Sequence, residues 1–87
     1  MNYKYKIGEA VRVRKDLSYD RRYYMQSGPD HHKSTNIVTL EMNRLAGEIV
    51  HILKYYGGQY EIKEDKGRFS WTDEMFKDGN PLFHGFF

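Results

Sequence analysis

The chain has 87 residues, of which 39% are hydrophobic, 30% are charged and 16% are aromatic, and it contains no cysteine. This length allows one domain, and the lack of cysteine excludes a disulfide framework, a thiolate metal site and a cysteine nucleophile. The net charge of +2 is too small to indicate a nucleic-acid-binding protein by itself. No apolar run is long enough for a membrane span or a signal peptide, so we expect one soluble, cytoplasmic domain over residues 1–87.

The first predicted element is a strand over residues 9–14, which follows Gly8 and alternates apolar with polar residues. This alternation predicts that Val11 and Val13 face the core, whereas Arg12 and Arg14 face solvent.

Residues 18–37 have no sustained period, and we interpret them as a variable loop region. Residues 22–25 could form a short strand, whereas residues 27–30 read Ser-Gly-Pro-Asp, a strong turn signal. A segment of this length with little regular structure is uncommon in a compact domain and is often functional.

A short helix of about two turns is expected within residues 38–47, with Val38, Met42 and Leu45 on one face. Thr35 or Asn36 could cap its start, and Gly47 is typical of a helix end. Residues 38–40 could equally form a strand.

The second half of the chain alternates strands and turns. We predict strands at residues 49–53, 59–63 and 68–71, with residues 55–56 extending the first. Gly57 and Gly58 predict a hairpin turn, and residues 72–76 predict one helical turn capped by Thr72. Residues 78–87 form a Phe-rich C-terminal tail, which could pack on the body or mediate self-association.

These elements predict a mainly β domain, either a small barrel or a strongly curved sheet, with one short helix and a terminal helical turn. We expect most aromatic side chains to lie in the core or on strand faces. The alternative is that some of the tyrosines form an exposed recognition surface. The predicted core consists of Val11, Val13, Leu45, Ile49, Ile52, Tyr60, Ile62, Phe69 and Trp71.

Four runs of this sequence resemble small Src-homology-3-like barrel proteins encoded by phages and prophages of Gram-positive bacteria. They are IGEAVRVRKDL from Ile7, Met42 followed by AGEIVHI, YEIKED from Tyr60, and WTDEMF from Trp71. The resemblance covers roughly residues 7–77 and implies a small barrel acting in the host bacterial cytosol. The segment 27–35 and the tail depart from the shared pattern, so we expect them to be particular to this protein.

Little in the sequence indicates catalysis. There is no nucleophile elbow, P-loop or dinucleotide fingerprint, and the acid pairs at 64–65 and 73–74 are typical of solvated or capping groups. Adjacent His31 and His32 rarely chelate one ion, and no zinc-ligand spacing is present. We therefore expect no enzymatic activity, no cofactor and no metal site.

The charge is unevenly distributed along the chain: residues 1–40 carry +4 and residues 41–87 carry −2. In the basic half, arginines alternate with tyrosines, a mixture that fits an acidic protein surface or a single-stranded nucleic acid. The first hypothesis is a module that binds a host or phage protein, and the resemblance extends it to inhibition of a host defence system. The second is a nucleic-acid-binding barrel. The candidate partner-binding residues are Arg12, Arg14, Arg21, Arg22, Tyr23, Tyr24, His31 and His32.

Overall fold

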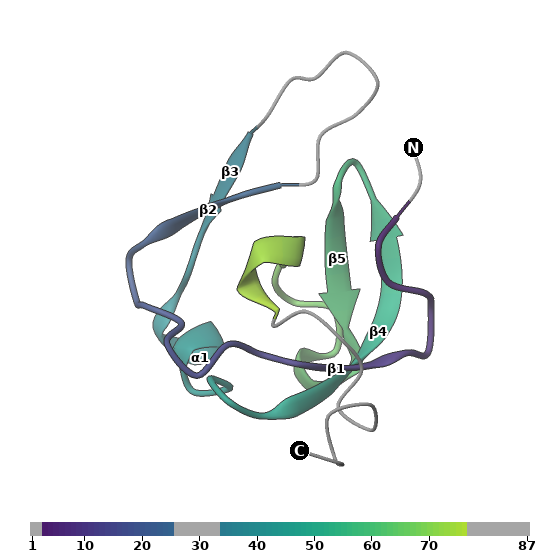
Figure 1. Ribbon diagram of the computed structural model, residues 1–87, viewed down its shortest axis with the longest axis horizontal. Coiled ribbons are helices and arrows are strands. Elements are labelled where there is room, and N and C mark those ends of the chain that lie inside the picture. The colour runs from purple at the N-terminus through teal and green to yellow at the C-terminus, as the bar shows by residue number, and fades with distance from the viewer. Residues whose placement is uncertain (1–2, 26–33, 77–87) are drawn as a thin grey trace, which may run out of the picture.

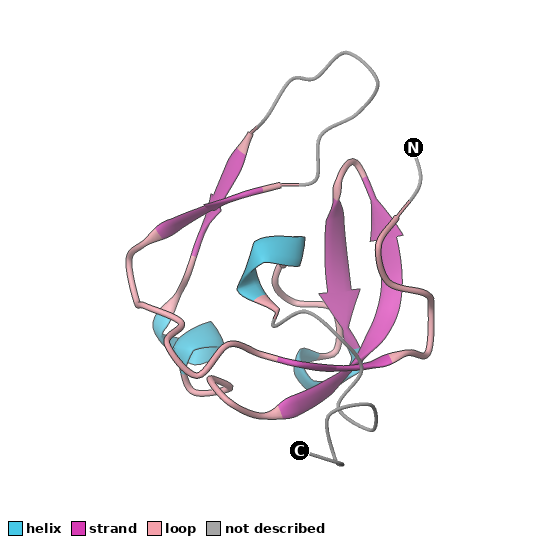
Figure 2. Cartoon of the chain, viewed as in Figure 1, coloured by secondary structure: helices cyan, strands magenta, loops and turns pink. Residues whose placement is uncertain are grey.

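The computed structural model describes residues 3–25 and 34–76, which form a mainly β domain of two antiparallel sheets with short helical turns (Figures 1 and 2). Three strands make the larger sheet, in the order β1 (Ala10–Arg12), β4 (Ile49–Tyr56) and β5 (Gln59–Ile62). The smaller sheet pairs β2 (Arg22–Tyr24) with β3 (Thr35–Ile37). Within the described ranges, no helix is long and apolar enough to cross a membrane.

The larger sheet confirms three sequence predictions. Val11 and Val13 are fully buried on and just beyond β1, as the alternation predicts, and Val11 pairs with Val50 of β4. Residues 55–56 extend β4 up to the hairpin turn. Gly57 and Gly58 form that turn, and both have positive φ angles, 59° and 84°, as the tight turns that match strand twist require.

The predicted strand at residues 68–71 is wrong except at its end. Trp71 alone forms an isolated bridge with Tyr60, through amide-to-carbonyl hydrogen bonds of 2.7 and 2.8 Å. The preceding carbonyl, that of Ser70, accepts instead from the Asn36 side chain at 3.1 Å. The segment is therefore shared between the two sheets and does not continue along β5.

The segment at residues 18–37 contains regular structure, because its two ends pair as β2 and β3. The alternative interpretation of residues 22–25 as a short strand is the one confirmed, over Arg22–Tyr24. The pairing continues outward, since the Met25 amide donates to the Ser34 carbonyl at 2.7 Å.

The helix α1 (Leu40–Asn43) has one turn, so the prediction of about two turns within residues 38–47 is wrong. Thr39 is the N-cap, and its hydroxyl accepts from the Met42 amide at 3.2 Å. The predicted caps, Thr35 and Asn36, lie in β3. Val38 cannot join the helix because its amide donates to the Arg21 carbonyl and so extends the smaller sheet.

Two 3-10 turns complete the fold: η1 (Lys63–Asp65) after β5, and η2 (Asp73–Met75) near the end of the described chain. The helical turn predicted at residues 72–76 is confirmed as η2, with Thr72 at its N-cap position. The predicted side-chain cap is wrong, because the buried Thr72 hydroxyl has no hydrogen-bond partner within the described chain. In Figure 1, η2 is the yellow-green turn between the smaller sheet and β5. It contacts β2, and Phe76 behind it bridges to Val13.

The core contains six of the nine predicted residues as buried side chains. Leu45 and Phe69 are half-buried against it. Ile49 is 44% exposed, and its prediction is wrong because β4 buries its alternate positions, Val50 and Ile52, which places Ile49 outward opposite Arg12. The core also includes residues that were not predicted: Tyr5, Leu17, Tyr23, Val38, Met42, Val50, Met75 and Phe76.

Aromatic rings hold the centre of this core together. Tyr60 packs edge-to-face on Tyr3, Tyr5 and Phe76, with ring centroids 5.6 to 6.0 Å apart, and Phe76 stacks on Trp71 at 5.7 Å. The buried Trp71 indole donates to Asp65 at 2.9 Å, so its polar edge is satisfied inside the fold. The expectation that most aromatic side chains lie in the core or on strand faces is confirmed for these rings and for the exposed Tyr24, Tyr55 and Tyr56, which lie on β2 and β4. It is wrong for Tyr19, which is 54% exposed outside any strand.

Candidate functional site

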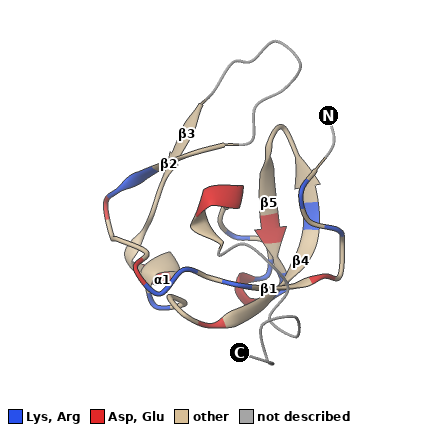
Figure 3. Cartoon of the chain, in the orientation of Figure 1, with Lys and Arg blue, Asp and Glu red and all other residues tan. Residues whose placement is uncertain are grey.

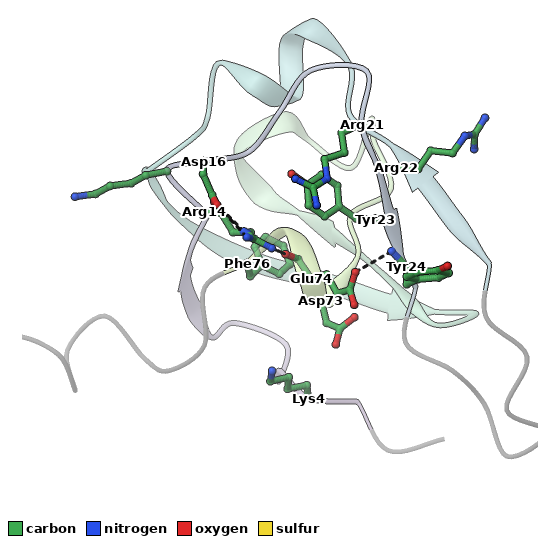
Figure 4. A pocket seen from close by; sticks show the side chains of 11 residues that line it. Lys4, Arg14, Asp16, Arg21, Arg22, Tyr23, Tyr24, Asp73, Glu74 and Phe76 are labelled. Atoms are coloured by element: carbon green, nitrogen blue, oxygen red, sulfur yellow. Dashed lines mark hydrogen bonds and ion pairs between the residues drawn. The ribbon is translucent and has the colours of Figure 1, made fainter.

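An open groove of about 940 Å³ lies where the N-terminal segment, the turn after β1, β2 and η2 meet (Figure 4). Its walls combine cations, acids and aromatic rings. The lining residues are Lys4, Arg14, Lys15, Asp16, Arg21, Arg22, Tyr23, Tyr24, Asp73, Glu74 and Phe76.

The groove has mixed charge, with five cations and three acids among its lining residues. Figure 3 shows where the two signs come from: the blue positions lie largely in the segment around β1 and β2, and η2 is red. The basic N-terminal half and the acidic C-terminal half of the chain therefore meet at this site. A ligand in the groove would contact both signs of charge within one binding surface.

Arg14 and Arg21 form the basic wall of the groove, and beneath them lies the ring of Tyr23, which is only 3% exposed. The guanidinium groups of Arg21 and Arg14 lie over this ring, with their central carbons 5.1 and 5.6 Å from its centroid. The Tyr23 hydroxyl accepts from the Ser18 amide at 3.3 Å, which fixes the ring from its far end. Tyr23 thus supports the arginines and offers little surface of its own.

Arg14 is held by a second interaction that Arg21 lacks within the described chain. Its guanidinium donates twice to Asp16, at 2.9 and 3.0 Å, and once to the Glu74 carbonyl at 3.2 Å. The hydrogen bond with Arg14 lowers the pKa of the Asp16 carboxyl, and the same bond raises the pKa of Arg14. The donors of Arg14 are therefore largely occupied by groups of this protein.

Glu74 connects η2 to the end of β2, because its Oε1 accepts from the Tyr24 amide at 3.0 Å. The dashed line in Figure 4 marks this contact. Tyr24 itself is 50% exposed and stands at the rim. The arrangement places an exposed aromatic ring beside an acidic turn.

Asp73 is the other acid of η2, and it is half-buried. Burial raises the pKa of its carboxyl, Lys4 opposes this shift, and Glu74 adds to it. In Figure 4 its carboxylate points into the opening between η2 and the segment that carries Lys4. Hydrogen bonds from the backbone of Asp73 and Glu74 also act against the rise in pKa. Within residues 3–25 and 34–76, no side chain donates a hydrogen bond to this carboxylate.

Five of the eight predicted partner-binding residues line the groove: Arg14, Arg21, Arg22, Tyr23 and Tyr24. Arg22 stands at its edge, and Figure 4 shows its side chain pointing away from the other arginines. Arg12 does not line the groove; it donates to the Gly47 carbonyl at 2.9 Å, which ties β1 to the turn after α1. His31 and His32 lie outside the described residues.

Sequence reasoning missed the acidic side of the groove and its N-terminal lysine. Asp73 and Glu74 were interpreted as capping or solvated groups, and Asp16 and Lys4 were not singled out. Since Tyr24 and Glu74 are 50 residues apart in the chain, no local pattern could join them. The one signal that pointed in this direction was the opposite charge of the two halves.

Comparison with known proteins found no match, whether to a family model, to a curated protein or to a solved structure. The described part of the chain also holds no cluster of three or more metal-ligating side chains.

Proposed function

We propose that this protein is a non-enzymatic binding module that occupies a surface of another protein through the mixed-charge groove. The observation that carries the proposal is the meeting of Arg21 and Tyr24 with Asp73 and Glu74 at one groove. Arginine and tyrosine are enriched where protein interfaces gain most of their binding energy. Protein surfaces also present both signs of charge, as this groove does.

The acids of the groove argue against the alternative, a nucleic-acid-binding face. A phosphate chain that followed Arg21 and Arg22 through the groove would also meet the carboxylates of Asp16, Asp73 and Glu74. Nucleic-acid affinity comes mainly from uninterrupted phosphate neutralisation by cations. One of the five cations, Arg14, is moreover already paired with Asp16.

We further propose that the two sheets belong to a small Src-homology-3-like barrel. Support comes from the three-stranded and two-stranded sheets, which the Asn36 side chain connects by donating to Gln59 and to the Ser70 carbonyl. The isolated bridges Val13 to Phe76 and Tyr60 to Trp71 attach the last described segment to the region of the larger sheet. A cytoplasmic location, a phage origin and inhibition of a host defence system stay predictions from the sequence and its resemblance. Self-association through the tail likewise stays a prediction, since residues 78–87 lie outside the described residues.

The proposal is tested by affinity capture with the tagged full chain, comparing two charge reversals of equal size. Arg21→Glu changes the groove, whereas Lys63→Glu changes an exposed position on η1 that does not line it. We expect a stoichiometric partner protein to be captured by the wild type and by Lys63→Glu but lost with Arg21→Glu. Equal capture by both variants would overturn the groove as the contact surface.

Nucleic-acid binding is measured in parallel with mixed-sequence DNA and RNA oligonucleotides. We expect no binding at about 50 mM salt. Binding at that salt which falls steeply toward about 200 mM, and which Arg21→Ala weakens, would replace the protein-binding proposal by the nucleic-acid alternative.

A further inference from the structure

The three arginines of the groove differ in what their guanidinium groups still have to offer. Arg14 donates hydrogen bonds to Asp16 and to the Glu74 carbonyl, so most of its donors are occupied. Arg22 stands at the edge of the groove and points away from the other arginines, and its Nη1 makes a long contact of 3.4 Å with the Thr35 hydroxyl. Arg21 lies over Tyr23, with its central carbon 5.1 Å from the ring centroid, and it makes no ion pair with an acid of the described chain.

Arg21 is thereby oriented before any ligand arrives. A guanidinium held over an aromatic ring has lost part of its rotamer freedom, so less entropy is lost when it binds. Its fork of donors matches a carboxylate, which it can bind through two parallel hydrogen bonds. Arg21 is the cation of the groove best prepared to receive an acidic group.

Asp73 is the acidic counterpart of Arg21 in the groove. Its carboxylate points into the opening and is half-buried. Backbone hydrogen bonds of Asp73 and Glu74 and the charge of Lys4 act on it, but within the described chain no side chain donates a hydrogen bond to it. Partial burial without such a donor costs free energy, which the raised pKa of this carboxyl reflects. A cationic donor brought by a ligand would reduce this cost.

From these two groups we infer that the groove receives a polypeptide segment of the partner carrying both charges, with a carboxylate on Arg21 and a lysine or arginine side chain on Asp73. This inference rests on the proposed protein-binding function and specifies the chemistry of the partner. Charge complementarity carries it: Arg21 and Asp73 both line the groove, and within the described chain neither forms an ion pair, although Asp16 and Lys4 act on them over longer distances. An all-acidic segment would be repelled by Asp73 and Glu74, and an all-basic one by Arg21.

Isotope-labelled full-length protein is titrated with short Ser/Gly peptides that carry one Glu and one Lys at varied spacing. Peptides with two Glu, with two Lys, and with neither serve as comparisons, and backbone amide shifts report both affinity and location. We expect the mixed peptide with one particular spacing to bind about threefold to tenfold more tightly than either the two-Glu or the two-Lys peptide. Its binding should shift the amide signals of Arg21, Tyr24 and Glu74. Tighter binding of the two-Glu peptide, equal binding of all peptides, or shifts confined to other surfaces would overturn the inference.

Variants assign each charge to its partner. Arg21→Ala should make the mixed peptide bind no better than the two-Lys peptide, and Asp73→Asn should make it bind no better than the two-Glu peptide. Arg44→Ala is the matched control and should leave the preference unchanged, because Arg44 is an exposed arginine that does not line the groove. If Arg44→Ala abolishes the preference as fully as Arg21→Ala, the assignment is wrong.

The same variants separate this inference from the proposed function. If the captured partner depends on Arg21 while Asp73→Asn has no effect, the binding module stands and the mixed-charge segment fails. If capture is insensitive to Arg21→Glu, the groove itself fails as the binding surface, whatever the peptides show.

Discussion

Charged residues of the groove affect the stability of the fold, and Asp73 is the clearest case. Burial raises the pKa of its carboxyl, so the protonated form is favoured more in the folded state than in the unfolded chain. Its contribution to stability is therefore fully present below the ordinary carboxyl pKa and is lost as the pH rises through the raised value. At neutral pH the ionised Asp73 makes the fold less stable than an uncharged residue would.

We predict that Asp73→Asn raises the urea midpoint of unfolding at neutral pH. This gain should shrink as the pH falls through the raised pKa of Asp73, and it should be gone below the ordinary carboxyl pKa. Asp16→Asn is the control of opposite sign, because the hydrogen bond with Arg14 lowers the pKa of Asp16. That variant should be less stable than the wild type at neutral pH, with the difference vanishing in acid. A loss of stability in Asp73→Asn at neutral pH would contradict a raised pKa of Asp73 in the folded state.

Tyr23 shows how burial redistributes roles between neighbouring residues. The sequence predicts both tyrosines as partner-binding residues, but Tyr23 is 3% exposed and Tyr24 is 50% exposed. Alternation along β2 explains the difference, since successive side chains point to opposite faces. Tyr24 can contact a partner directly, whereas Tyr23 acts by positioning Arg21.

At the scale of elements, the smaller sheet needs a connection to the rest of the fold, because two strands alone are marginally stable in water. Asn36 of β3 supplies one: its amide donates to Gln59 Oε1 at 3.0 Å and to the Ser70 carbonyl at 3.1 Å. Both partners belong to the region around β5. The basic wall of the groove, carried by β2, therefore depends on a contact made by the neighbouring strand.

Asn36→Ala should lower the free energy of unfolding by about 1–3 kcal/mol, because two partly buried hydrogen bonds are lost together. The measurement is urea unfolding followed by the fluorescence of Trp71. Arg22→Ala, in the paired strand, removes only an exposed contact of 3.4 Å and should change stability by less than about 0.5 kcal/mol. Similar effects of the two substitutions would show that Asn36 does not connect the sheets.

At the scale of the whole molecule, the two ends of the described chain are joined through Tyr60. Its hydroxyl accepts from the backbone amides of Lys4 and Tyr5, at 2.9 and 3.3 Å, across more than fifty positions of sequence. Its ring packs on Phe76 close to η2. Tyr60 thus fixes the N-terminal segment, with Lys4, beside the turn that carries Asp73.

We predict that Tyr60→Phe keeps the ring packing but lowers the free energy of unfolding by about 1–3 kcal/mol, since it leaves the buried Tyr5 amide without this acceptor. Hydrogen exchange at the Tyr5 amide should accelerate more than exchange within β4. Tyr55→Phe, on an exposed ring that stacks on Tyr3 at 4.1 Å, should leave both measurements nearly unchanged. Unaltered exchange at Tyr5 in Tyr60→Phe would disprove this role.

Structural features that depend only on residues close together in the chain can be predicted from the sequence. The alternation around Val11 and Val13, the glycine pair of the β4–β5 hairpin and the turn at η2 each follow from a local pattern with a local physical cause. The mainly β class and six buried core positions follow from the same patterns.

Long-range packing sets which partners the backbone hydrogen-bonding groups and the charged side chains contact. The Ser70 carbonyl and the Val38 amide serve the smaller sheet, which ends a predicted strand and shortens a predicted helix. Asp73 and Glu74 join Arg21 and Tyr24 in one groove because packing brings distant segments together. Hydrogen-bonding groups and charges have many possible partners along a chain, and the choice among them is settled by long-range packing, which no local pattern encodes.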